Sequence, residues 1–152
     1  MKKILLIASA FIVGFTASAQ QKADDVVKVK TDKFDFGKIK QSVPVTTYFE
    51  FTNTSDKPIV IESATATCGC TTPEYAKEPI APNATTKIKV GYNAGASGVF
   101  TKPVTVKFAG VQEPKIVTIT GEVLDAASYD TYVKENSKQK PKSTTAKTTK
   151  SS

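Results

Sequence analysis

Apolar and polar residues alternate along most of the chain, with the two-residue period that is typical of half-buried β-strands. Seven segments carry or contain this pattern: residues 26–30, 34–37, 45–52, 59–66, 85–92, 103–108 and 115–124. In the third of them, Phe49 and Phe51 share one face, while Tyr48 and Glu50 share the other. The pattern therefore predicts about seven short strands and no helical period before Asp125.

Turn-forming residues separate these segments at intervals of roughly ten residues, as in all-β sandwiches. We therefore predict an all-β fold, an immunoglobulin-like antiparallel β-sandwich of about seven strands over residues 34–124. A small barrel is the main structural alternative. Residues 20–33 are predicted to be an N-terminal extension with a candidate first strand. Residues 71–83 contain three prolines, and since proline cannot donate to a sheet ladder, we expect a loop or an edge crossing there.

The first 19 residues have the layout of a secretory signal peptide. Two lysines precede an apolar run that is too short to span a bilayer, and the segment closes with Ala17, Ser18 and Ala19. We expect cleavage after Ala19 and export to the periplasm or cell envelope, or to the extracellular medium. No cysteine lies near the expected cleavage site to accept a lipid.

The last segment, residues 125–152, is rich in lysine, serine and threonine. Its end lacks aromatic and branched aliphatic side chains, so it cannot bury enough surface to offset the loss of chain entropy. We expect a disordered tail. It serves either as a passive solubilising segment or as a contact for anionic envelope polymers and phospholipid headgroups.

The formal net charge is +7, with 21 basic residues against 14 acidic ones. All of the excess lies in the leader and in residues 134–152 of the tail, so the part of the chain between them is formally neutral. Every basic residue is lysine, and arginine, the preferred ligand of phosphates and base edges, is absent. We therefore expect no nucleic-acid partner. The chain also has no histidine, which removes the usual general base and makes a non-enzymatic role the leading interpretation.

The two cysteines, Cys68 and Cys70, flank Gly69 and are the clearest chemical feature of the chain. In a flat strand, residues two apart lie about 6.6 Å from each other, at the limit of what a disulfide spans. Glycine adopts backbone angles that other residues resist, so Gly69 is predicted to support the turn that closes the pair. So local a bond would stabilise the fold by only about 1.6 kcal/mol.

Several interpretations of the pair stay open at this point. Cys68 and Cys70 are two small residues buried on a strand, or a redox-active pair that exchanges disulfides with a partner. A third interpretation is that the two cysteines bind a soft metal, copper or zinc. A closed zinc site needs four ligands, so a partner would have to complete it. A crosslink between chains is a further alternative.

Several short motifs together resemble a known family. They are F-D-F-G-K-I at residues 34–39, F-T-N-T at 51–54, C-G-C-T-T-P at 68–73, I-A-P-N at 80–83, V-G-Y at 90–92 and G-E-V at 121–123. The chain resembles the secreted bacterial family catalogued as domain of unknown function 1573, over about residues 34–123, and C-G-C-T followed by proline is the most specific motif. Asn83 stands where the family usually has glycine. The resemblance implies an immunoglobulin-like sandwich similar to sperm-protein and pilus-chaperone domains, and it implies no activity.

Together these observations favour a secreted envelope protein that acts as a non-enzymatic binding or scaffold module. Its partner is expected to be an envelope protein or polymer, held by sheet edges and loops, with edge-strand addition as the natural mode. The alternative function is a redox-active or copper- or zinc-handling protein that acts through Cys68 and Cys70. The expected cofactor is none in the first case and a soft metal in the second.

Overall fold

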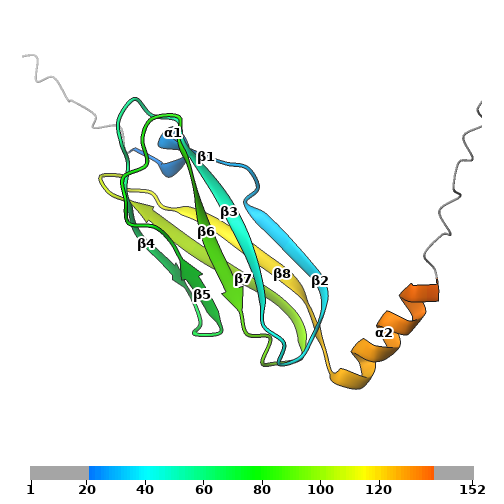
Figure 1. Ribbon diagram of the computed structural model, residues 1–152. Helices are drawn as coiled ribbons and strands as arrows, with labels where there is room; N and C mark the ends of the chain where they lie inside the picture. The colour runs from blue at the N-terminus through cyan, green and yellow to red at the C-terminus, as the bar shows by residue number, and fades with distance from the viewer. Residues whose placement is uncertain (1–20, 139–152) are drawn as a thin grey trace, which may run out of the picture.

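The computed structural model of the protein describes residues 21–138, and these form a two-layered β-sandwich with a short helix near each end of the described chain (Figure 1). The two helices are α1 (Ala23–Val26) and α2 (Ala126–Lys138). Within these residues no helix has the length and apolar character needed to cross a membrane.

Each layer is a four-stranded sheet. The first has the order β1 (Val27–Val29), β3 (Val45–Asn53), β6 (Thr85–Tyr92), β5 (Thr71–Glu74), with antiparallel neighbours throughout. The second has the order β2 (Lys33–Lys40), β8 (Lys115–Leu124), β7 (Gly98–Phe108), β4 (Ile61–Ala66). The predicted β-sandwich is confirmed, with eight strands instead of seven.

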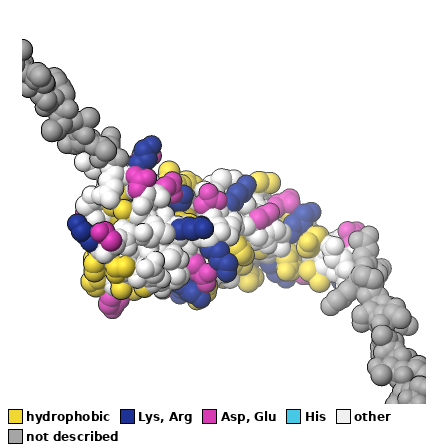
Figure 2. All heavy atoms as spheres, turned by 90° about the horizontal axis from the view of Figure 1, so that it is seen from above, with side chains coloured by type: hydrophobic (Ala, Val, Ile, Leu, Met, Phe, Trp, Pro, Cys, Tyr) yellow, Lys and Arg dark blue, Asp and Glu magenta, His cyan; other side chains and the backbone are white. Residues whose placement is uncertain are grey.

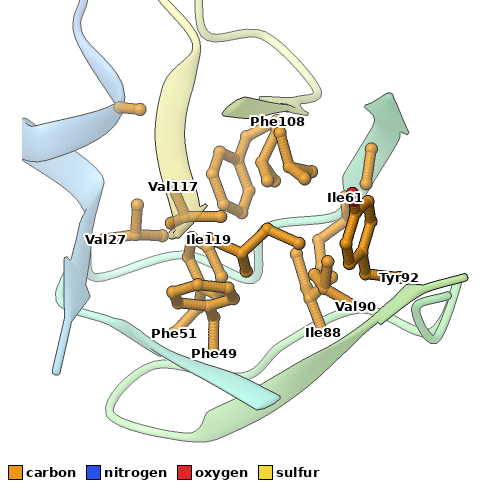
Figure 3. Close-up of a cluster of buried hydrophobic side chains, with 14 of the residues drawn as sticks. Val27, Phe49, Phe51, Ile61, Ile88, Val90, Tyr92, Phe108, Val117 and Ile119 are labelled. Atoms are coloured by element: carbon orange, nitrogen blue, oxygen red, sulfur yellow. The ribbon is translucent and has the colours of Figure 1, made fainter. Parts of the chain in front are cut away.

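The core lies between the two sheets and consists of the inward residues of the alternating segments (Figure 3). Phe51 on β3 and Phe108 on β7 are fully buried and meet across the core, with ring centroids 5.9 Å apart. Tyr92 on β6 stacks on Phe100 of β7 at 4.2 Å. Since burial follows the two-residue period, the alternation correctly predicted which face of each strand points inward.

One strand pairing differs from the predicted antiparallel arrangement. Strand β2 runs parallel to β8, with Lys33 opposite Thr118 and Lys40 opposite Leu124. The chain changes sheets between β1 and β2, so that β1 pairs with β3 and β2 pairs with β8 in the opposite layer. The register of β2 shifts between Asp35 and Lys38, where Gly37 has a φ of 65°. Strand β2 therefore has a bulge at Gly37.

The additional strand, which the sequence pattern did not predict, is β5, and it lies in the segment that was expected to be a loop or an edge crossing. It is the edge of the first sheet and contains Pro73, which is opposite Val90 of β6. Proline is tolerated there because an edge strand has one side without ladder partners.

The ordered domain also begins earlier and ends later than the expected limits of 34 and 124. Before it, Val26 of α1 and Val27 of β1 are buried in the core, so the N-terminal extension is part of the sandwich. After it, residues 126–138 form α2 and are not disordered. Asp125 caps this helix by accepting a hydrogen bond from the backbone N–H of Ser128 at 3.0 Å.

Helix α2 is also held against the second sheet. Lys40 forms an ion pair with Asp130 at 3.1 Å, and Lys38 lies over the ring of Tyr132 at 5.1 Å. These two contacts join the helix to β2, although the helix has few apolar side chains to bury against the sheet. The expected signal peptide and the remainder of the expected disordered tail, residues 139–152, lie outside the described residues and stay predictions.

Candidate functional site

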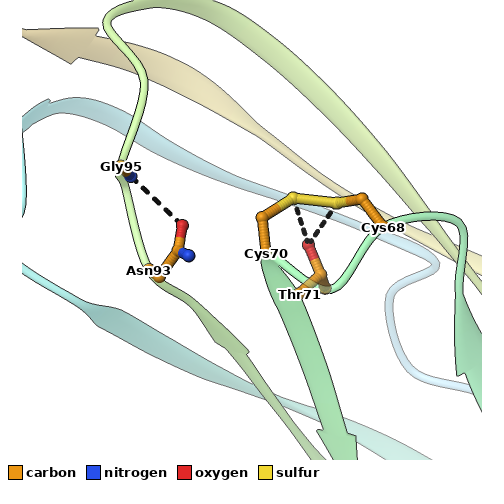
Figure 4. Close-up of a disulfide and its surroundings, with 5 residues drawn as sticks. All are labelled: Cys68, Cys70, Thr71, Asn93 and Gly95. Carbon is orange, nitrogen blue, oxygen red and sulfur yellow. Dashed lines mark hydrogen bonds between the residues drawn. A yellow bond between two sulfur atoms is a disulfide. The ribbon is translucent and has the colours of Figure 1, made fainter.

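Cys68 and Cys70 lie in the turn between β4 and β5, where the chain passes from one sheet to the other (Figure 1). They are joined by a disulfide with their Cα atoms 5.3 Å apart (Figure 4). Both are half-buried, and neither is on a strand. The interpretation of a buried thiol pair on a strand is therefore wrong for this structure.

Gly69, at the tip of this turn, is exposed and does not have the left-handed conformation that only glycine adopts freely. No atom lies within 4 Å of the place that a Cβ would take. The turn is closed by a hydrogen bond from the Thr71 N–H to the Cys68 carbonyl at 3.3 Å. The predicted need for unusual angles at Gly69 is thus wrong, and the position is open to solvent.

Thr71 lies directly beneath the disulfide and was missed by sequence reasoning. Its side chain is buried, and its Oγ1 lies 3.9 Å from the Sγ of Cys68 and 3.9 Å from the Sγ of Cys70 (Figure 4). The backbone of Cys70 is fixed as well, because its carbonyl accepts a hydrogen bond from Asn93 at the end of β6, at 3.0 Å. Thr71 belongs to the C-G-C-T motif, but the motif gives no indication that its hydroxyl lies against both sulfurs.

The disulfide turn belongs to a cluster of three loops at one end of the sandwich, which we call the disulfide end: residues 41–44, 67–70 and 93–97. Hydrogen bonds join the loops to one another. Ser42 donates its N–H to the carbonyl of Ala94 at 2.9 Å, and the side-chain amide of Gln41 donates to Gly95 at 3.0 Å. With the bond from Asn93 to the disulfide turn, all three loops are tied together.

Two of these loop residues have backbone conformations that are unfavourable for residues with a side chain. Ser42 has a φ of 61° and Ala94 a φ of 52°, and the two are the partners of one hydrogen bond. A non-glycine residue in the left-handed region costs on the order of 1 kcal/mol and persists only where its surroundings hold it. The loops of the disulfide end are therefore fixed in one conformation.

The three loops of the disulfide end contain no lysine, aspartate or glutamate; the nearest acid in sequence to their contacts is Asp125, next to Leu124, whose carbonyl accepts a hydrogen bond from the Gln41 N–H at 2.8 Å. The loops at the opposite end are different: the β3–β4, β5–β6 and β7–β8 connections all contain charged residues. Along the face of the sandwich seen in Figure 2, lysines and acids are likewise interspersed. Val43, with 48% of its surface exposed, is an apolar residue in the 41–44 loop of the disulfide end.

A shallow groove of about 250 Å³ lies next to the disulfide end, on the outer face of the first sheet. Pro44, Thr46 and Thr72 line it together with the ion pair of Glu74 and Lys89, whose charged atoms lie 3.1 Å apart, and Gly91 leaves its floor free of a side chain. The groove is open and small, so it suits a single protruding side chain of a partner and not an enclosed substrate.

No set of acid–base groups accompanies the cysteines. Two carboxyl groups have a displaced pKa in the described part of the chain, and both shifts have structural causes. Hydrogen bonds and the charges of Lys87 and Lys30 lower the pKa of Glu50, and hydrogen bonds from Ser128 lower the pKa of Asp125. Residues 21–138 also contain no group of three or more His, Cys, Asp or Glu side chains arranged to hold a metal ion.

In the disulfide form neither sulfur is a thiolate, and thiolates are what soft metals bind. Copper or zinc binding therefore stays a prediction for the reduced pair. Titration of the reduced protein with Cu(I) or Zn(II) tests it, with the double variant Cys68→Ala and Cys70→Ala as control.

Comparisons with solved structures show the fold. The chain is similar to an ASH/PapD-like domain of human CEP192, with 8% identity, a TM-score of 0.59 and coverage of 80% of this chain and 99% of that one. It is similar to a protein of unknown function from Porphyromonas gingivalis W83, with 15% identity, a TM-score of 0.55 and coverage of 70% of this chain. The match spans half the length of that protein, 50%.

A third similar structure is the SrpA adhesin of Streptococcus sanguinis, with 9% identity, a TM-score of 0.51 and coverage of 74% of this chain and 62% of that one. No curated protein matches the sequence. A family model described as "Protein of unknown function (DUF1573)" matches residues 27–123, so the resemblance extends to β1. The chain belongs to this family.

Proposed function

We propose that this protein is a non-enzymatic binding module of the cell envelope and that the disulfide end is its contact surface. The observation that carries the proposal is that three loops, distant in sequence and without charged side chains, are hydrogen-bonded to one another in a fixed arrangement. Binding surfaces are most often found on loops that a rigid scaffold holds in place. The adhesin among the similar structures agrees with such a role without specifying a partner.

Fixed loops favour binding because little conformational freedom remains to be lost on contact. Each flexible side chain or loop that must be ordered at an interface weakens association by about 0.5–1.5 kcal/mol. Here Ser42 and Ala94 already hold their conformations through a mutual hydrogen bond. The surface is therefore pre-organised.

The lack of charge determines the kind of partner. A charged group that docks on an uncharged surface loses its water without gaining an opposite charge, which disfavours anionic polymers and acidic or basic protein patches. We infer a protein partner with an uncharged surface that contacts Val43 and places one side chain in the groove beside Pro44.

Edge-strand addition, the mode expected from the sequence, has less support. The edge of β2 is interrupted by the bulge at Gly37 and carries three lysines, both of which are devices that protect an edge from pairing. On the opposite side of the sandwich, the Tyr75 hydroxyl donates to the carbonyl of Glu62 on the β4 edge at 3.2 Å. The loops of the disulfide end have no such protection.

Photocrosslinking in the producing cell tests the proposal. The photoreactive residue benzoyl-phenylalanine replaces Val43 at the disulfide end and, as a matched control, Ile116 on the outer face of β8, which is 54% exposed. We expect one heterologous protein to be crosslinked at position 43 and not at 116. The identified partner is then purified, and its affinity is measured by calorimetry.

Two charge variants decide whether that contact is the proposed one. Ser97→Glu places a charge on the disulfide end, and Gln112→Glu places the same charge in the β7–β8 loop at the opposite end. We expect Ser97→Glu to weaken binding by roughly tenfold or more and Gln112→Glu to leave it unchanged. Equal crosslinking at both positions, an adduct between two copies of this chain, or salt-sensitive binding to an anionic polymer would each overturn the proposal.

A further inference from the structure

The disulfide is accessible to an incoming reagent. Gly69, between the two cysteines, is exposed and has no atom within 4 Å of its outer side. The two sulfurs differ, because Cys70 packs against the hydrophobic core whereas Cys68 is not part of that packing. A thiol that approaches from solvent therefore meets Cys68 first.

The bond is not what joins the two sheets. Strand β4 is held by its antiparallel ladder to β7, and β5 by its ladder to β6, on either side of the turn. The disulfide closes a ring between residues only two apart in sequence, which removes little entropy from the unfolded chain. A bond that adds little to stability and lies half-buried in an exposed turn is open to exchange with thiols.

Thr71 is positioned to assist such an exchange. When one sulfur of a disulfide is attacked, the other leaves as a thiolate, and a hydrogen-bond donor next to it stabilises the charge. The buried hydroxyl of Thr71, 3.9 Å from each sulfur, is such a donor. Its contact to the Sγ of Cys70 is the relevant one when Cys68 is attacked (Figure 4).

We propose that Cys68–Cys70 is a dithiol–disulfide exchange site whose co-reactant is a protein dithiol, with Cys68 as the attacked sulfur and Thr71 as a positioning residue. This inference rests on the proposed function in that the dithiol belongs to the partner docked at the disulfide end. The partner thiolate forms a bond to the Sγ of Cys68, and the Cys68–Cys70 bond breaks. Cys70 leaves as a thiolate and takes up a proton.

The second partner thiol then attacks the mixed disulfide and releases Cys68. In total, two electrons and two protons pass from the dithiol to the cysteine pair, and the partner becomes a disulfide. The reverse sequence re-forms the bond between Cys68 and Cys70.

The first test uses dithiothreitol as the dithiol, so it does not depend on the docked partner. The folded protein is equilibrated with dithiothreitol or with glutathione mixtures, quenched with acid, alkylated, and its thiols are counted by mass spectrometry. We expect reversible reduction of the pair without denaturant and an unchanged circular dichroism spectrum. A disulfide that is reduced only after unfolding, or a reduced chain that unfolds, would overturn the proposal.

The second test assigns the sulfurs. Cys70→Ser leaves Cys68 as a single thiol, and Cys68→Ser leaves Cys70. With the aromatic disulfide dithionitrobenzoate, we expect Cys68 to react roughly tenfold faster, because Cys70 is packed against the core. Equal rates, or a faster Cys70, would contradict the assignment.

The third test separates the role of the Thr71 hydroxyl from its packing. Thr71→Val keeps the shape and removes the donor, and we expect reduction by dithiothreitol to slow about fivefold to tenfold. Thr71→Ser should restore the rate, which a purely structural role does not predict. If docking fails but reduction proceeds as described, the proposed function is wrong and the exchange site stands. The opposite result leaves a binding module with an inert disulfide.

Discussion

Removal of the disulfide should cost the fold little, and this is the prediction on which the exchange site depends. The perturbation is the double variant Cys68→Ala and Cys70→Ala, compared with the reduced wild-type protein. For a ring of three residues the loop-entropy relation gives about 1.6 kcal/mol at 25 °C, against about 3 kcal/mol for a ring of fifteen. The ladders of β4 and β5 on either side of the turn remain in place without the bond.

Urea unfolding followed by far-ultraviolet circular dichroism measures this loss, and the chain has no tryptophan to provide a fluorescence signal. We expect the midpoint to fall while the slope with denaturant stays the same, because the surface exposed on unfolding does not change. In thermal unfolding, the corresponding decrease is about 5–8 °C. The reduced wild type isolates the bond, since it keeps the sulfur atom of Cys70 against the core.

A loss above about 3 kcal/mol in the reduced wild type would refute the reasoning, because it would exceed what closure of so small a ring supplies. The disulfide would then be a structural staple of the crossover between sheets. A large loss in the double variant with a small loss in the reduced protein would instead identify the packing of Cys70 as the source.

Three further predictions concern the scaffold. Asn53→Ala should destabilise the protein by about 3–4 kcal/mol, because the buried side chain donates to two carbonyls, at 2.7 and 2.8 Å, and accepts two further hydrogen bonds. The control Asn93→Ala loses one exposed hydrogen bond and should cost under about 1 kcal/mol. Chemical unfolding measures both free energies. Gly121→Ala should lower the free energy of unfolding by about 1–3 kcal/mol, because its Cβ would lie 2.8 Å from an aromatic ring carbon and 2.9 Å from a backbone oxygen. Gly69→Ala should change the thermal midpoint little, because no atom lies within 4 Å of its Cβ position. A destabilised Gly69→Ala variant would contradict the open turn. Hydrogen bonds and the charges of Lys87 and Lys30 hold the pKa of Glu50 below its ordinary value, so its stabilising contribution is present above the unfolded-state pKa and is lost as the pH falls through the folded-state pKa. Glu50→Gln should remove this part of the acid dependence in urea titrations between pH 7 and about pH 3. An unchanged pH profile would show that the ion pairs are fully screened.

The sequence predicts well what depends on burial. Val104, Val106 and Phe108 alternate with polar residues, and the alternation alone indicates that they point into the core, as they do. The alternation does not indicate whether a strand pairs with its neighbour in a parallel or an antiparallel direction. The parallel pairing of β2 with β8 was missed for this reason, since parallel and antiparallel partners bury the same face of a strand.

The candidate site was only partly predictable. Cys68 and Cys70 were found because they are the only cysteines in the chain, but their place in a turn depends on where β4 ends. The left-handed conformations of Ser42 and Ala94 carry no sequence signal, because neither residue type favours them; the hydrogen bond between the two loops holds them. Asn53 follows the predicted strand 45–52 and is a polar residue, yet it is completely buried.

The parallel pairing of β2 with β8 has a consequence for the order in which the chain can fold. Strand β2 is close to the start of the described chain and β8 close to its end, so the second sheet cannot be completed until nearly the whole polypeptide is available. Contacts between such distant segments slow folding, because a long loop must close before they form. A chain that emerges gradually from a ribosome therefore leaves β2 without its partner until β8 arrives, and the second sheet closes last.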